Sequence, residues 1–194
     1  MKNIIHIVDT FCLLKGGPTQ SILGLTQAQE KLGFKVSILS LNYPKKIPNK
    51  KLKIFFGLNA IYFLIVQLFK FLNNKNNQYI VHFHGIWSLS LIIPFYICTF
   101  LKTKIFYHVR GMLENWSLNQ KKTLKILAFV IYQKRILNLS DYIVCSTVHE
   151  KKAVQSFFKS KAKFLISPNG LNEDLLQNKK IFEKISLEKW AKKN

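Results

Sequence analysis

The sequence has few acidic residues. Nine Asp and Glu stand against 30 Lys and Arg, which gives a formal net charge of +21 over 194 residues. A protein with this charge attracts phosphates, nucleic acids and anionic lipids without selecting among them. Compositional drift is an alternative source of the excess, because the lysines are spread along the chain with many Asn and Ile. The charge therefore indicates anionic partners in general and identifies none.

Cysteine is scarce as well. Cys12, Cys98 and Cys145 lie far apart, with neither the spacing of a metal site nor the even number of a disulfide framework. They suit a reducing compartment. The N-terminus also lacks a signal peptide pattern, because its apolar run at residues 3–8 is short and is followed by Asp9. We therefore expect a cytoplasmic protein.

One apolar run without Lys, Arg, Asp or Glu, residues 79–101, is long enough to span a bilayer. Two histidines, Gly85 and Pro94 interrupt it, and its spacing changes from strand-like to helix-like after Trp87. We interpret it as a strand, a glycine loop and a buried helix. A transmembrane helix is the alternative.

Short β-branched runs alternate with amphipathic segments along the chain, which is typical of βαβ units around a parallel sheet. The pattern predicts strands at residues 3–8, 35–39, 51–56, 79–83, 104–109, 142–145 and 163–166, and helices at 19–31, 59–72, 88–101, 118–139 and 149–159. The predicted fold class is α/β, a Rossmann-like doubly wound parallel sheet. We expect one domain over residues 1–170, with residues 171–194 as an interdomain linker remnant or a C-terminal tail or helix.

Glycine and polar residues follow four of the predicted strands. In doubly wound sheets, ligands bind outside the carboxyl ends of the strands. The marked residues are Gly16, Gly17 and Pro18 after the first strand, His84 and Gly85 after residues 79–83, Arg110 and Gly111 after residues 104–109, and Thr147 after residues 142–145. We therefore expect these loops to form one ligand site.

Gly16, Gly17 and Pro18 precede the predicted helix at residues 19–31, and Gly33 suits its C-cap. A helix N-terminus with exposed N–H groups binds anions when glycines let the ligand approach closely. We expect Gly17 to adopt a positive φ and to leave space for a phosphate. The alternative is that the glycines only turn the chain.

His82 and His84 flank Phe83 on a predicted strand. We expect the two histidines to point to opposite faces of the sheet, so that one is structural. His84, beside Gly85, is the candidate site residue, and a loop histidine bonded within the protein is the alternative.

Arg110 has a planar, permanently charged guanidinium that can hold a phosphate or carboxylate by two hydrogen bonds. An ordinary surface ion pair is its alternative role. Thr147 and Glu150 form the Thr-x-x-Glu pattern of a capping box, in which each side chain bonds the backbone N–H of the other residue. A second role of Glu150 near the ligand site remains open.

Glu114 and Trp116 could line a groove for a hydroxyl-bearing ligand, because aromatic faces stack on rings and carboxylates bond hydroxyls. A buried Trp116 that anchors the predicted helix at residues 118–139 is the alternative. Neither paired glycosidase carboxylates nor a Ser-His-Asp arrangement nor a metal-spaced cluster is evident. Asp9 is a single acid after the first strand and forms no Asp-x-Asp metal motif.

Five motifs occur in a characteristic order. They are GGP at residues 16–18 with the helix after it, HFHGIW at 82–87, RGMLENW at 110–116, SDYIV at 140–144 with the Thr-x-x-Glu pattern, and PNG at 168–170. Together they resemble the N-terminal domain of the family 4 glycosyltransferases, enzymes of the two-domain GT-B fold. The resemblance covers about residues 1–172.

The resemblance implies retaining, metal-independent transfer of a sugar from a nucleotide-sugar donor to a saccharide or lipid-linked saccharide acceptor. Bacterial surface polysaccharide biosynthesis is the usual setting, and no cofactor is implied. Arg110 stands where the family often has a histidine and is implied to contact the transferred sugar or its phosphate. The implied catalytic residues are His84, Arg110 and Glu150, and the implied donor- or acceptor-binding residues are Gly16, Gly17, Pro18, Gly85, Gly111, Glu114, Trp116 and Thr147.

Most donor contacts in the family come from a second domain, which residues 171–194 are too few to form. We therefore expect a truncated chain, weak or inactive alone, or one half of a split enzyme. We expect it in the cytoplasm or peripherally at the inner face of the cell membrane, without a specific nucleic acid partner. The alternatives are a nucleotide-binding regulatory domain and a non-catalytic basic module for nucleic acid or anionic membrane. The last predicts a contiguous lysine face, whereas these lysines are scattered.

Overall fold

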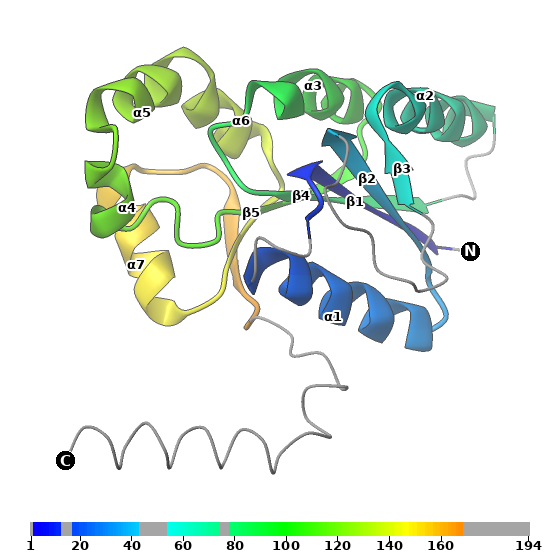
Figure 1. The fold of residues 1–194 in the computed structure, drawn as a ribbon, viewed down its shortest axis with the longest axis horizontal. Helices are drawn as coiled ribbons and strands as arrows, with labels where there is room; N and C mark the ends of the chain where they lie inside the picture. Colours follow the sequence, from blue (N-terminus) through cyan, green and yellow to red (C-terminus); the bar gives the residue numbers. More distant parts are fainter. Residues whose placement is uncertain (1, 13–16, 43–53, 74–77, 169–194) are drawn as a thin grey trace, which may run out of the picture.

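A computed structural model describes residues 2–12, 17–42, 54–73 and 78–168. Seven strands of this described part form one sheet in the order β3-β2-β1-β4-β5-β6-β7, and every neighbouring pair is parallel (Figure 1). Helices cover both faces of the sheet. The predicted Rossmann-like, doubly wound α/β fold is therefore confirmed.

The strands and helices alternate along the chain as the sequence predicted. The strands are β1 (Lys2–Thr10), β2 (Lys35–Asn42), β3 (Ile54–Phe56), β4 (Gln78–His84), β5 (Lys104–His108), β6 (Tyr142–Cys145) and β7 (Lys163–Ile166). The helices are α1 (Gly17–Lys31), α2 (Gly57–Asn73), α3 (Ile92–Phe100), α4 (Asn115–Asn119), α5 (Lys122–Ala128), α6 (Lys134–Leu139) and α7 (Val148–Phe157), with a 3-10 turn η2 (Leu89–Leu91) and a π-helical segment η3 (Phe129–Gln133). Gly16, residues 51–53 of the third predicted strand and residues 171–194 lie outside the described residues.

Two apolar clusters hold the layers together. On one face α1 packs on a small cluster that contains Val8, Ile22 and Ile38. On the other face α2, α3 and α6 pack on a larger cluster, which includes Ile7 and Phe83 from the central strands (Figure 1). Successive side chains of a strand alternate between these faces, so the central strands need apolar residues at nearly every position.

The strand order creates a switch point between β1 and β4. From β1 the chain moves outward through α1 to β2 and β3, and α2 then carries it back to β4 on the other side of β1. Because the crossover direction reverses here, helices α1 and α2 lie on opposite faces of the sheet (Figure 1). A crevice forms at the carboxyl ends of β1 and β4, where ligands of doubly wound sheets bind.

The prediction of one continuous helix at residues 118–139 is wrong, because the structure has several shorter helical segments there. The chain leaves α4 at Asn119, and Lys121 then adopts a left-handed backbone with φ +52°, which an α-helix cannot continue. The chain becomes helical again at Lys122 and passes through η3 into α6. The Lys125 ammonium donates a hydrogen bond of 2.5 Å to the Ser117 carbonyl oxygen, so it bridges the break between α4 and α5.

Helix α1 ends in the glycine cap that the sequence predicts. Gly33 has φ +82°, its N–H donates to the Glu30 carbonyl at 2.9 Å, and the Phe34 N–H donates to the Gln29 carbonyl at 3.2 Å. These two bonds form a Schellman motif, which needs a left-handed residue at the position of Gly33.

The apolar run at residues 79–101 forms β4, a loop and helices, as predicted. No described helix combines the length and the apolar character that crossing a bilayer requires.

Replacing Gly33 by alanine should lower the free energy of unfolding by about 1 kcal/mol, because a Cβ is strained at positive φ. An added Cβ would meet no atom within 4 Å, so backbone strain alone sets the cost. Urea unfolding monitored by circular dichroism measures it. Gly17→Ala is the matched control, since Gly17 also has open space but no positive φ. Equal losses in both variants would contradict the strain argument.

Candidate active site

A cavity of about 220 Å³ opens at the switch point, at the carboxyl ends of β1 and β4. Four residues predicted for the site line it together: Pro18, His84, Gly85 and Arg110. They come from three of the four loops that the sequence singled out. The structure therefore brings three of the four predicted loops together at one edge of the sheet, whereas Gly111 and Thr147 do not line this cavity.

Asp9 also lines this cavity and contributes a carboxylate to it. The sequence alone showed Asp9 only as a single acid after the first strand and did not identify it as a site residue. Its Oδ1 accepts hydrogen bonds from Ser88 Oγ at 2.8 Å, Ser90 Oγ at 2.6 Å and Asn42 Nδ2 at 2.9 Å. These donors follow β4 and end β2, so the carboxylate joins three strands at the cavity. A sequence signal was present, because an acid near the end of the first strand of a doubly wound sheet lies at the switch point.

Arg110 contributes the cationic group. Its Nη1 donates to Ser21 Oγ at 2.9 Å, and its Nη2 donates to His84 Nδ1 at 3.1 Å. Burial lowers the pKa of the guanidinium to about 10, while the nearby Glu150 carboxylate opposes this shift. Arg110 thus stays charged at neutral pH. Because it is partly buried and bonded to α1 and β4, the alternative of an exposed surface ion pair is wrong.

The turn that carries Arg110 is held by Glu150. Arg110 and Gly111 both have left-handed backbones, with φ +50° and +72°, and such a conformation is unfavourable for arginine. The Gly111 N–H donates to Glu150 Oε1. Glu150 Oε2 also accepts from the Ser146 N–H at 2.5 Å and from Ser146 Oγ at 2.6 Å. A buried carboxylate therefore fixes the turn against the N-terminus of α7.

Half of the predicted capping box is confirmed. Thr147 Oγ1 accepts from the Glu150 N–H at 3.0 Å and caps α7. The reciprocal half is wrong, because the Glu150 carboxylate bonds Ser146 and Gly111 in place of the Thr147 N–H. The turn after β5 lies beside α7, and its Gly111 N–H is one of the donors that bond Glu150. The Thr-x-x-Glu pattern could not indicate this donor, because Gly111 is distant from it in the sequence.

His82 and His84 lie on the same face of the sheet, so the prediction of opposite faces is wrong. Residues two apart on a strand share a face, and only successive residues alternate. In register, His6 on β1 lies beside His82, and His108 on β5 lies beside His84. The rings stack, with centroids 4.8 Å apart for His6 and His82 and 4.3 Å apart for His84 and His108. Four of the five histidines thus form one buried cluster.

The hydrogen bonds that link Arg110, His84, His6 and Gln29 have one direction. Arg110 can only donate, so His84 Nδ1 must accept and its Nε2 carries the proton. His84 Nε2 then donates to His6 Nδ1 at 2.8 Å, and His6 Nε2 donates to Gln29 Oε1 at 2.7 Å. Both nitrogens of His84 are occupied by protein groups. In this arrangement His84 orients Arg110, and its catalytic role stays a prediction.

Burial lowers the pKa of every histidine in the cluster, because desolvation disfavours the charged form. For His6 the pKa falls to about 4, although its bond to Gln29 opposes the shift. The Arg110 charge and the neighbouring histidines lower these values further. The cluster is therefore neutral at physiological pH, and for His84 and His6 the chain of hydrogen bonds requires this form.

Two predicted glycines have different environments. Gly17 is the first residue of α1 and has no positive φ, so that prediction is wrong; Pro18 already fixes a helical start and needs no special backbone. The space around Gly17 is open. Gly85 has φ +85°, and its N–H donates to the His108 carbonyl at 3.0 Å. Gly85 is thus the glycine whose conformation shapes the cavity.

Glu114 and Trp116 do not line the cavity. Trp116 is 63% exposed at the start of α4, and its indole N–H donates to Glu114 Oε2 at 3.0 Å. The alternative of a buried anchor is therefore wrong for Trp116. Its acceptor role stays a prediction, as does a ligand contact by Thr147, whose hydroxyl caps α7.

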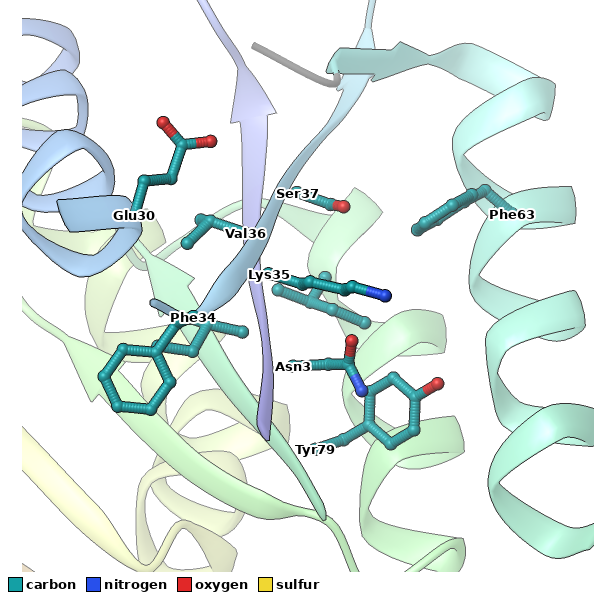
Figure 2. A pocket seen from close by; sticks show the side chains of 10 residues that line it. Asn3, Glu30, Phe34, Lys35, Val36, Ser37, Phe63 and Tyr79 are labelled. Atoms are coloured by element: carbon teal, nitrogen blue, oxygen red, sulfur yellow. The ribbon is translucent and has the colours of Figure 1, made fainter. Parts of the chain in front are cut away.

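A second cavity of about 330 Å³ lies at the amino ends of β1 and β2. Figure 2 shows side chains around it from both faces of the sheet, with Glu30 on α1 and Phe63 on α2. Its position is opposite to the edge where doubly wound sheets bind ligands, so we assign the candidate site to the cavity at β1 and β4. No three His, Cys, Asp or Glu side chains of the described part converge as metal ligands would.

The histidine cluster should make the protein less stable as the pH falls from 7 to 5. Unfolded histidines take up protons near pH 6.5, whereas folded His6 does so only near pH 4. The unfolded state therefore binds more protons in this window, and His6 alone should contribute a loss of about 2 kcal/mol. Urea unfolding at both pH values measures the loss. His6→Gln should reduce it, whereas His149→Gln, at an 84% exposed side chain, should not. Identical pH dependence in all three proteins would refute the assignment.

A family model described as Glycosyltransferase Family 4 matches residues 15–175. The match begins just before α1 and ends beyond β7, so it includes Arg110, Glu150 and most of the cavity lining. No curated protein and no solved structure matches the chain. The family match covers far more than half of the sequence. We conclude that this chain belongs to glycosyltransferase family 4.

Proposed function

We propose that this domain takes part in the transfer of a sugar from a nucleotide-sugar donor to a saccharide or lipid-linked saccharide acceptor. The family match supports glycosyl transfer in general. One observation supports the more specific proposal: Asp9 and Arg110 bring opposite charges to a single cavity at the switch point of the sheet. A nucleotide sugar and its acceptor require both kinds of recognition, since they combine anionic phosphates with neutral hydroxyls.

Arg110 is suited to the phosphates of the donor. Its guanidinium is charged at neutral pH and is oriented by Ser21, His84 and the Gly111 turn. Charge-assisted hydrogen bonds from such a preorganised group strengthen as negative charge develops on the departing diphosphate. Pro18 also lines the cavity, so the N-terminus of α1 adds partial positive charge nearby.

Asp9 is suited to sugar hydroxyls. Its carboxylate is held in place by hydrogen bonds from Ser88, Ser90 and Asn42. The carboxylate oxygens can therefore accept hydrogen bonds from sugar hydroxyls without reorganisation. In the proposed reaction the bond between the anomeric carbon and the diphosphate oxygen breaks, and its electron pair stays on the diphosphate. The acceptor oxygen bonds to the same face of the anomeric carbon, and its proton passes to the departing diphosphate. The configuration is thereby retained.

In this proposal Arg110 and the N-terminus of α1 supply the positive charge that the phosphates need. Neither a metal ion nor another cofactor is required. A bacterial surface polysaccharide pathway is the proposed setting. The proposed location is the cytoplasm, with peripheral contact at the inner face of the cell membrane where lipid-linked acceptors are present. A separate C-terminal half is a proposed partner for the donor side.

Arg110→Ala should weaken nucleotide-sugar binding at least about tenfold, because a buried charge-assisted hydrogen bond is worth roughly 1.5–3 kcal/mol. Arg110→His should lose less, since an imidazole keeps a donor. Isothermal titration with a panel of nucleotide sugars, of the full chain alone and together with a C-terminal half from a family member, measures both. Arg135→Ala removes the same charge from an exposed position on α6 and should leave the affinity unchanged. Equal losses at Arg110 and Arg135 would indicate a bulk charge effect and contradict the site.

Transfer itself is tested with nucleotide sugars and with saccharide or lipid-linked acceptors, by the chain alone and with a C-terminal half from a family member. We expect a product with the donor's anomeric configuration, assigned by NMR, and a rate that EDTA does not change. An inverted product would contradict retention. A loss with EDTA that Mg²⁺ restores would contradict metal independence, and transfer by neither preparation would contradict the proposed function.

A further inference from the structure

Helix α5 and the following η3 carry an unusual apolar surface. No residue of α5 is buried, although most helices of globular proteins turn their apolar stripe to a core. Five large aliphatic side chains of this segment are between 45% and 71% exposed: Leu124, Ile126, Leu127, Val130 and Ile131. Their spacing of three and four residues places them side by side along the helix. In Figure 1, α5 lies at the margin of the fold.

Part of this stripe forms one wall of an apolar groove of about 410 Å³. Leu124, Leu127 and Ile131 line it from the helix, and Trp87 and Leu89 line it from the loop after β4. Isolated apolar residues on a surface are ordinary, but a contiguous patch of this kind marks a binding surface.

The groove is preformed, because η3 holds the loop in place. The Trp87 N–H donates to Gln133 Oε1 at 3.2 Å, and the Trp87 carbonyl accepts from the Tyr132 hydroxyl at 2.7 Å. Trp87 has φ +74°, a conformation that persists in a large side chain only where the surroundings enforce it. The loop therefore presents Leu89, which is exposed, beside the aliphatic stripe.

The same loop separates the groove from the candidate active site. Gly85 and Ser88 line the cavity that contains Asp9 and Arg110. Trp87 and Leu89, from the same short segment, line the groove. The apolar groove and the cavity that contains Asp9 and Arg110 are thus neighbours on two sides of residues 85–91.

The segment that carries the stripe has charges of a single sign. Residues 115–140 contain no Asp or Glu and five basic residues, namely Lys121, Lys122, Lys125, Lys134 and Arg135. Lys121 and Lys125 line the groove itself. Apolar side chains bordered by lysines complement the surface of a lipid bilayer, where phosphate groups lie above hydrocarbon chains.

We propose that α5, η3 and Leu89 form a docking surface for an anionic lipid bilayer. The aliphatic side chains enter the boundary of the acyl chains, and the exposed Lys121, Lys122 and Lys134 contact lipid phosphates. The proposal rests on the proposed function only for its purpose, which is to bring the cavity of Asp9 and Arg110 to a lipid-linked acceptor. Docking itself does not depend on glycosyl transfer.

Other occupants fit this surface less well. A single lipid chain or an extended peptide in the groove would cover Leu124 and Ile131 but not Ile126 and Val130, which are outside the groove lining. A second copy bound symmetrically would place the same lysines against each other without acids to pair with them.

The test is co-sedimentation of the full chain with vesicles of phosphatidylglycerol and phosphatidylcholine, compared with vesicles of phosphatidylcholine alone. We expect binding to the anionic vesicles that weakens with added salt. The double variant Leu124→Glu and Leu127→Glu should lower the partition coefficient at least about tenfold, because it removes apolar insertion and adds repulsion. Leu32→Glu, at a 75% exposed position at the end of α1, is the control and should retain most of the binding.

Three outcomes would overturn the proposal. They are no binding to anionic vesicles, equal binding by the double variant and the wild type, and a wild-type dimer in light scattering that the double variant abolishes. Circular dichroism and urea unfolding of the double variant should match the wild type and report that it is folded. If vesicle binding behaves as expected while Arg110→Ala leaves nucleotide-sugar affinity unchanged, the docking surface stands and the proposed function fails.

Discussion

The site depends on how one partly buried guanidinium is held. A buried charge is costly unless hydrogen bonds replace its hydration, and Arg110 draws these from Ser21 on α1 and His84 on β4. Its backbone is left-handed, and the adjoining Gly111 N–H is fixed by Glu150. Two helices and two strands therefore determine the position of a single cation, and the cavity at the switch point takes its polarity from it.

The architecture was predictable because it follows from local patterns. The short apolar runs of β6 and β7 predicted those strands to the residue, and the glycine after α1 marked its cap. The break before α5 was not predictable, because lysine carries no preference for the left-handed backbone that Lys121 adopts. A helical pattern also gives no sign of the wider turn at η3, which tertiary contacts such as the bond from Trp87 to Gln133 accompany.

The candidate site was predictable in part. The rule that ligands bind at carboxyl ends placed His84, Gly85 and Arg110 together. His6 and Gln29 were missed because His6 lies inside β1 and Gln29 in the last turn of α1, where a single polar residue gives no local signal. Only the tertiary structure, in which His6 bonds both His84 and Gln29, shows that they belong to one hydrogen-bonded chain that ends at Arg110.

The in-register histidines limit how these strands can change in evolution. Inserting one residue before His82 in β4 would exchange the two faces of the strand beyond that point. The imidazoles would then meet the apolar layer around Phe95, and Phe83 would turn towards α1. Each imidazole would lose its partners on β1 and β5. Insertions are therefore tolerable in the loops of this domain, whereas β1, β4 and β5 can accept substitutions but no change of length.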